Sequence, residues 1–104
     1  MKKIEKSMLA AVHGRRDWNC GNTRVEVSYA GRIDVYLRGY RIYAEDGTGR
    51  NRIFTLAGNN TLTTISRLRA LGVNLFRNNG KTYASKCKSG TNAIEIDKYK
   101  WYNF

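Results

Sequence analysis

The sequence predicts a single α+β domain in which helices cover one face of an antiparallel sheet. Apolar residues recur at helical spacing up to residue 13, alternate with polar residues from residue 22, and return to helical spacing after residue 61. Short glycine-containing links separate the alternating segments, which is typical of antiparallel strands. A chain of 104 residues is long enough for one hydrophobic core and too short for two, so we expect residues 1–104 to form one domain.

Residues 2–13 are expected to form an amphipathic helix that ends at Gly14. Its apolar side carries Ile4, Met8, Ala11 and Val12, and its polar side carries Lys2, Glu5 and Lys6. Residues 15–22 lack periodicity and are rich in turn formers, so we expect a loop there.

Four strands are expected between residues 22 and 57. In the first, residues 22–30, the side chains of Val25, Val27 and Tyr29 alternate with polar ones and are predicted to point inward. The other three strands are predicted over residues 33–38, 41–45 and 52–57. Their short links favour an antiparallel meander.

A second helix follows the meander. Thr61 is its candidate N-cap and Gly72 its stop. The predicted apolar side carries Leu62, Ile65, Leu68 and Leu71. A hairpin over residues 73–86 and a candidate strand over residues 93–97 complete the order: N-terminal helix, four-stranded meander, second helix, and two or three C-terminal strands.

The charge of the chain predicts the class of its partner. Lys and Arg number 19 against 8 Asp and Glu, a formal net charge of +11. A surplus of this size attracts phosphate-rich or acidic macromolecules. Because 41% of the residues are hydrophobic and 12% are aromatic, the cations are expected to decorate a folded body and not a disordered tail.

No motif in the sequence predicts a reaction. His13, Asp17 and Cys20 lie close in sequence, but their spacing fits neither an activated thiol nor a zinc site. The segment Asp46-Gly47-Thr48-Gly49-Arg50 lacks the Gly-Lys-Ser/Thr ending and the following helix of a phosphate-binding loop, so we expect a turn. We therefore predict a protein that is not an enzyme and needs no metal or cofactor. A small nuclease is a further alternative.

The sequence carries no recognisable secretory signal and no apolar stretch long enough for a membrane span. We expect a cytoplasmic protein without membrane contact. Cys20 and Cys87 are too few for a disulfide framework, so both are expected to be free thiols.

Two surfaces are candidates for contact with a partner. The outward face of the meander is predicted to interleave arginine with tyrosine, which can neutralise phosphates and stack unpaired bases. The C-terminal third is basic and aromatic, and the second helix extends it. The candidate contact residues are Tyr36, Arg38, Arg41, Tyr43, Arg67, Arg69, Arg77, Lys81, Lys86, Lys88, Lys98, Lys100 and Trp101.

Three segments share a pattern with a known group of proteins. They read Asn22-Thr23-x-Val25, then Val35-Tyr36-Leu37-x-Gly39 with Ile42, then Thr63-Thr64-x-Ser66-Arg67-Leu68-x-Ala70-Leu71. The pattern, over about residues 22–72, resembles small uncharacterised proteins of tailed bacteriophages. Members tend to carry His where Arg38 stands and Asn where Tyr40 stands. The resemblance implies a phage origin and a role inside an infected bacterium, and it assigns no catalytic residue.

Charge and resemblance together predict a small basic phage-type protein that contacts nucleic acid or a nucleoprotein complex. The alternative is an inhibitor of a host or defence protein whose acidic surface would meet the cations. Tyr, Trp and Arg are favoured at protein interfaces as well, so composition leaves both hypotheses open.

Overall fold

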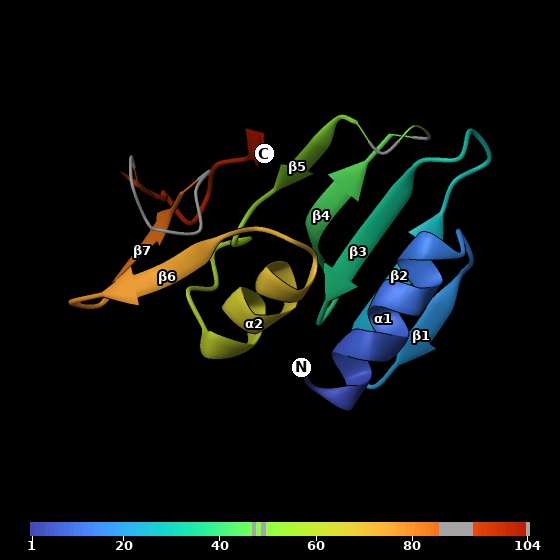
Figure 1. The fold of residues 1–104 in the computed structure, drawn as a ribbon, viewed down its shortest axis with the longest axis horizontal. Helices are drawn as coiled ribbons and strands as arrows, with labels where there is room; N and C mark the ends of the chain where they lie inside the picture. Colours follow the sequence, from blue (N-terminus) through green and yellow to red (C-terminus); the bar gives the residue numbers. More distant parts are fainter. Residues whose placement is uncertain (47, 49, 86–92, 104) are drawn as a thin grey trace.

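The computed structural model describes residues 1–46, 48, 50–85 and 93–103, in which two helices lie against antiparallel strands (Figure 1). This arrangement confirms the predicted α+β class. The elements are α1 (Lys3–His13), β1 (Trp18–Cys20), β2 (Thr23–Val27), β3 (Ile33–Leu37), β4 (Tyr40–Glu45), β5 (Arg52–Phe54), α2 (Leu62–Ala70), β6 (Leu75–Asn78), β7 (Lys81–Ala84), β8 (Ile94–Glu95) and β9 (Tyr102–Asn103).

The larger sheet has the strand order β1-β2-β3-β4-β5-β9, which confirms the meander and adds a strand at each edge. The expected loop over residues 15–22 is wrong in part, because Trp18 pairs with Val25 and Cys20 with Thr23. Gly21, at φ +57, makes the tight turn between them. At the other edge, Tyr102 pairs with Phe54. Two- and three-residue strands are too short to show alternation, so periodicity misses them.

The second sheet has the order β6-β7-β8. The predicted hairpin is confirmed, with Asn78 paired to Lys81 across its turn. Asn79 and Gly80 both have positive φ, at +53 and +77, as a tight two-residue hairpin turn requires. The last predicted strand is confirmed in a shorter form, Ile94–Glu95.

The core lies between the larger sheet and the two helices. Helix α1 packs on β1 and β2, while α2 packs on β4 and β6 (Figure 1). Met8 of α1, Leu68 of α2 and Val35 of β3 are all fully buried there. Thr61 caps α2 as predicted, because its Oγ1 accepts a hydrogen bond from the Thr64 amide. Leu62, predicted on the apolar side of α2, is instead 71% exposed.

A β-bulge in β4 changes which side chains point outward. The register pairs Val35 with Tyr43 and Tyr36 with Arg41, so Ile42 has no direct partner on β3. Ile42 and Tyr43 are both buried, at 1% and 2% exposure. The prediction that Tyr43 faces outward with Arg41 is therefore wrong, because simple alternation does not hold across a bulge.

Tyr29 was predicted to point into the core and is instead fully exposed. Strand β2 ends at Val27, and residues 28–32 form the turn to β3. In that turn the Ser28 amide donates to the Arg32 carbonyl at 2.7 Å. The inward alternation of β2 thus stops before it reaches Tyr29.

A buried polar cluster joins both helices to the sheet. Arg67 Nη1 donates to Glu5 Oε2 at 2.7 Å, and Arg67 Nε donates to Thr23 Oγ1 at 3.1 Å. Ser66 Oγ donates to the same Glu5 oxygen at 2.6 Å. Glu5 and Arg67 are only 3% and 4% exposed. The prediction of Glu5 on the outer side of its helix, and of Arg67 on a contact surface, is wrong for this reason.

The hydrogen bonds of this cluster also set the protonation of Glu5. Burial raises the pKa of its carboxyl, but the hydrogen bonds from Ser66 and Arg67 outweigh burial and hold that pKa below the usual 4.5. A lowered folded-state pKa stabilises the fold above the unfolded-state pKa, and the stabilisation is lost as the pH falls through the folded-state value.

We expect Glu5→Gln to lower the free energy of unfolding by about 3 to 5 kcal/mol near neutral pH, because it leaves Arg67 buried without its counter-ion. The gap between the variant and the wild type should narrow as the pH falls below 4.5, where wild-type Glu5 takes up a proton. Urea unfolding across the acid range measures both effects. The matched control is Glu26→Gln, which breaks an exposed ion pair and should cost about 1 kcal/mol or less. Equal losses in the two variants would contradict the importance of the cluster.

Candidate nucleic-acid interface

The outer face of the larger sheet, turned away from the helices, pairs its arginines with carboxylates. Arg24 Nε lies 3.2 Å from Glu26 Oε1. Asp34 Oδ1 lies 3.1 Å from Arg32 Nη2 and 3.5 Å from Arg41 Nη1. Each of these guanidinium groups therefore has a counter-ion within its own sheet, and the positive field of this face is reduced.

The aromatic rings of the same face are covered by these arginines. The Arg24 guanidinium lies 4.4 Å from the centre of the Tyr36 ring, and that of Arg41 lies 5.0 Å from the Trp101 ring. Cation–π contacts of this kind favour the observed positions of the two rings. The structure thus brings Trp101 of the predicted C-terminal surface against Arg41 of the predicted meander face, and on both rings it places a guanidinium where a stacked base would lie.

Tyr43 is absent from this face because the bulge turns it inward. Burial raises the pKa of its phenol to about 12, and the nearby Glu45 carboxylate acts in the same direction while Arg52 opposes it. Tyr43 is therefore a core residue.

The C-terminal segment 97–101 is docked against the turn before α2. The Gly58 amide donates to the Lys98 carbonyl at 2.7 Å. Gly58 has φ +78, and a Cβ there would lie 3.0 Å from the Tyr99 ring. Asp97 Oδ1 accepts from the Tyr99 amide at 2.9 Å. The segment presents Lys98 and Lys100 to solvent.

The remaining predicted contact residues are scattered. Arg38 is exposed in the turn between β3 and β4, and Arg77 is exposed on β6. Lys81 of β7 lies 3.7 Å from Glu95. Lys86 and Lys88 lie outside the described residues. Arg69 is exposed on α2. It therefore lies on the helical side of the molecule, across the sheet from the predicted contact face of the meander.

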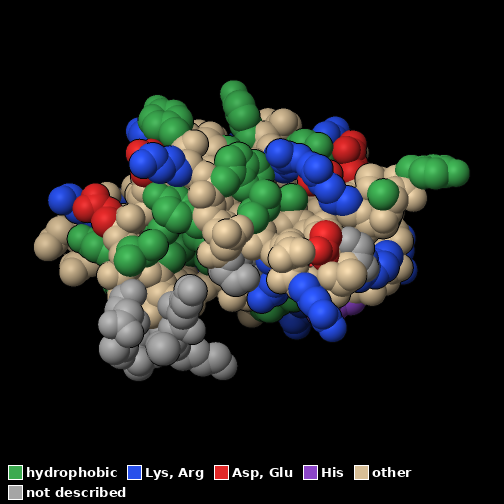
Figure 2. All heavy atoms as spheres, turned by 90° about the horizontal axis from the view of Figure 1, so that it is seen from above, with side chains coloured by type: hydrophobic (Ala, Val, Ile, Leu, Met, Phe, Trp, Pro, Cys, Tyr) green, Lys and Arg blue, Asp and Glu red, His purple; other side chains and the backbone are tan. Residues whose placement is uncertain are grey.

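A second set of cations lies on the helical side, and Asp17, the acid next to it in the chain, accepts a hydrogen bond from the Val27 amide. Its members are Lys2, Lys3, Lys6, Arg15, Arg16 and Arg69, all exposed, and we call them the basic helical surface. Residues 1–16 and 58–72 contain one acid, Glu5, which is buried with Arg67. Figure 2 shows Lys and Arg side chains gathered along the lower edge of that view, the side on which the helices lie. Among the residues that the structure describes, no carboxylate pairs with this set.

The buried cluster at Glu5 joins the two helices that carry Lys6 and Arg69 of this surface. Lys6 follows Glu5 on α1, and Arg69 lies one turn after Ser66 on α2. Because Ser66 donates directly to Glu5, these two cations border the same helix–helix junction. Helix α1, with 11 residues, is about 16 Å long and has Arg15 and Arg16 just beyond its other end.

A model of the family described as Kyanoviridae Gp96 protein matches residues 1–103. The chain belongs to this family of phage proteins. Membership confirms the predicted phage origin. No curated protein and no solved structure matches the chain.

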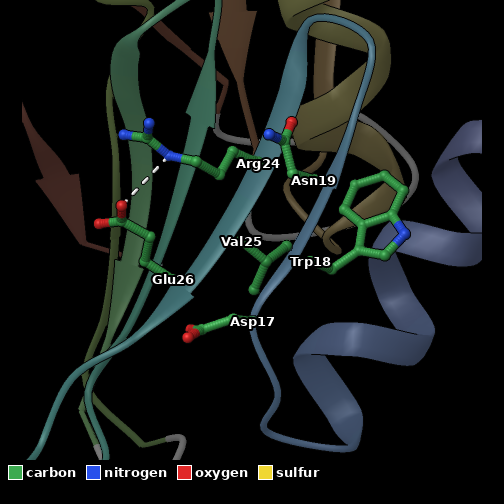
Figure 3. A pocket seen from close by; sticks show the side chains of 6 residues that line it. All are labelled: Asp17, Trp18, Asn19, Arg24, Val25 and Glu26. Atoms are coloured by element: carbon green, nitrogen blue, oxygen red, sulfur yellow. Dashed lines mark ion pairs between the residues drawn. The ribbon is translucent and has the colours of Figure 1, made fainter.

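A shallow hollow of this Gp96-family chain, about 340 Å³ in volume, lies at the β1 edge of the larger sheet (Figure 3). Trp18 points toward α1, whereas Arg24 and Glu26 lie on the other side of the strands and pair with each other (Figure 3). Asp17, also at its rim, accepts a hydrogen bond from the Val27 amide at 2.8 Å. A binding pocket requires polar groups that converge on one point, and the polar groups around this hollow do not.

The candidate cluster of His13, Asp17 and Cys20 forms no metal site in the part of the chain that the structure describes. Cys20 is a free cysteine, as predicted, and its side chain is exposed, whereas Cys87 lies outside the described residues. No helix in the described ranges is both long and apolar enough to cross a membrane.

The lysines of the basic helical surface were not among the predicted contact residues. A signal was present in the sequence: Glu5, Met8 and Val12 follow the i, i+3, i+7 spacing of one helical face. When Glu5 is placed on the apolar side of α1, the charged residues that remain on the outer side of the helix are all basic.

We expect Tyr43 to ionise with a midpoint of about 12 in the folded protein, against 10.0 for an unperturbed tyrosine. A raised folded-state pKa gives a stabilisation that is complete below pH 10.0 and is lost as the pH rises toward about 12. A spectrophotometric titration at the phenolate absorption band measures it, and Tyr43→Phe should lack this last step. If the titration curve of Tyr43→Phe keeps this last step, the tyrosine with the raised pKa is not Tyr43.

We expect Gly58→Ala to destabilise the fold and to release the C-terminal segment. The positive φ alone costs about 1 to 2 kcal/mol. Gly80→Ala is a matched control, because its φ of +77 equals that of Gly58 within a degree and no atom lies within 4 Å of its Cβ position. Urea unfolding compares the two, and the excess loss in Gly58→Ala reports the contact with Tyr99. No excess would contradict the docking of Tyr99.

Proposed function

We propose that this phage protein binds nucleic acid through its basic helical surface, by electrostatic attraction to the phosphate backbone. The observation that carries the proposal is that every exposed charged side chain of residues 1–16 and of α2 is basic. The one acid of these segments is buried in an ion pair. Cations without counter-ions are the groups that can neutralise phosphates and release condensed ions.

The two sides of the molecule differ in what they offer a polyanion. On the sheet side, a phosphate would have to displace Glu26 from Arg24 or Asp34 from Arg41. On the helical side, Lys3 and Lys6 project from one side of α1 with no such competitor. Binding on the helical side therefore avoids the cost of breaking an existing ion pair.

The proposed contacts recognise the charge of the phosphate backbone and not the base sequence. Lysine and arginine contacts to phosphate fix position and supply affinity, whereas sequence is read at base edges. We therefore propose a binding protein with little sequence preference.

Replacing Lys3 and Lys6 with Gln is expected to weaken binding and its dependence on salt. On duplex DNA each neutralised phosphate contributes a slope of about −0.9 in log affinity against log salt, so the double variant should lose about 1.8 of the wild-type slope. Fluorescence anisotropy of a labelled duplex over a salt series measures it. Lys98→Gln with Lys100→Gln removes the same charge from the C-terminal segment and should change the slope much less.

Two results would contradict this proposal. Binding that is independent of salt would exclude phosphate neutralisation, and equal effects of the two double variants would show that net charge matters and location does not. Capture of a host protein that survives nuclease treatment, with no binding to purified nucleic acid, would instead support the alternative, an inhibitor that meets an acidic protein surface.

A further inference from the structure

The turn between β2 and β3 holds a tyrosine fully exposed to solvent. Tyr29 has a relative exposure of 108%, so none of the described residues covers either face of its ring. The rings of Tyr36 and Trp101, by contrast, each lie under an arginine of the same chain. Tyr29 therefore offers an aromatic surface that a ligand can occupy without displacing a protein group.

The backbone that carries Tyr29 is well ordered by hydrogen bonds. The Ser28 amide donates to the Arg32 carbonyl at 2.7 Å, and the Gly31 amide donates to the Ser28 carbonyl at 2.9 Å. Ser28 Oγ accepts from the Arg32 amide at 3.0 Å. Because three such bonds close the turn, the backbone at Tyr29 is already ordered. Little backbone entropy is therefore lost when a ligand binds to the ring.

The same turn is joined to the end of α1. Arg15 Nη1 donates to the Gly31 carbonyl at 3.4 Å, and Arg16 follows with an exposed side chain. The basic helical surface thus reaches the turn that carries Tyr29.

The charged groups at or beside the turn are four arginines and two aspartates. Of these, Asp34 lies against Arg32 and Arg41, and Asp17 accepts from the Val27 amide. Arg15 and Arg16 keep no acidic partner among the described residues, so a positive surplus remains beside the ring.

An unpaired nucleobase is the ligand whose chemistry fits a free ring beside unpaired arginines. Bases stack on aromatic side chains with about 1 to 3 kcal/mol per base, and the adjoining phosphate can meet a guanidinium. In a duplex the bases are already stacked on one another, so the ring gains nothing from them. We infer that the protein binds single-stranded nucleic acid, with one base stacked on Tyr29 and the backbone led along α1 from Arg15 toward Lys6. This inference rests on the proposed function and names its substrate class.

The test compares single strands with a duplex. Labelled oligomers of thymidylate DNA and of uridylate RNA, each about 20 nucleotides long, and a duplex of the same length are titrated with the protein at low salt. Tyr29→Ala should weaken binding to one or both single strands by about tenfold, and should change duplex binding by less than about twofold. Tyr29→Phe keeps the ring and should bind as the wild type does. Tyr29 lies outside the core, so circular dichroism melting should be unchanged in both variants.

The outcomes separate this inference from the proposed function. A loss in Tyr29→Ala confined to single strands supports the inference, and the oligomer affected most identifies DNA or RNA. Equal losses on single strand and duplex, or no loss on either, overturn it while the effect of Lys3→Gln with Lys6→Gln still stands. Wild-type protein that binds none of the three nucleic acids overturns both. The salt slope of Tyr29→Ala should equal that of the wild type, because no charge is removed.

Discussion

The buried ion pair between Glu5 and Arg67 is the constraint on which the rest of the structure depends. It fixes α1 to α2, and through Thr23 it fixes both helices to β2. A buried pair of this kind needs further hydrogen bonds to offset its desolvation, and Ser66 supplies a second donor to the Glu5 oxygen that Arg67 contacts. The same pair removes the one acid of the helical side from solvent. Packing and surface charge are thus two consequences of a single interaction.

The two faces of the molecule use arginine for different purposes. On the sheet, Arg24 and Arg41 each cover an aromatic ring and pair with a carboxylate of the same chain. Exposed pairs of this kind contribute little to stability and reduce the local field. On the helical side the cations pair with no carboxylate of the described residues, and the self-repulsion of Lys2, Lys3 and Lys6 is an unfavourable term that an anionic ligand would relieve.

The sequence was sufficient where a local rule decides the structure. Thr61 and Gly72 mark the ends of α2 because a capping hydroxyl and a left-handed glycine are local requirements. It was insufficient where tertiary contacts override local pattern. Tyr43 turns inward because a bulge shifts the parity of β4, and Glu5 turns inward because Arg67 arrives from a helix more than fifty residues away in the chain. Tyr43 and Arg67 are therefore core residues and not parts of the two predicted contact surfaces.

Charge and stacking would contribute differently as conditions change. Attraction between exposed cations and phosphates is screened over about 8 to 10 Å at physiological ionic strength, so the contribution of Lys3 and Lys6 falls steadily as salt rises. Stacking on Tyr29 involves contact between neutral rings and is screened little. Both affinities should fall as salt rises, and the ratio of single-strand to duplex affinity should grow for an equal number of phosphate contacts, because each neutralised phosphate contributes a slope of about −0.7 on a single strand and about −0.9 on a duplex. A ring held by Ser28 and Gly31 beside Arg15 can supply that selectivity only if the turn keeps its place against α1.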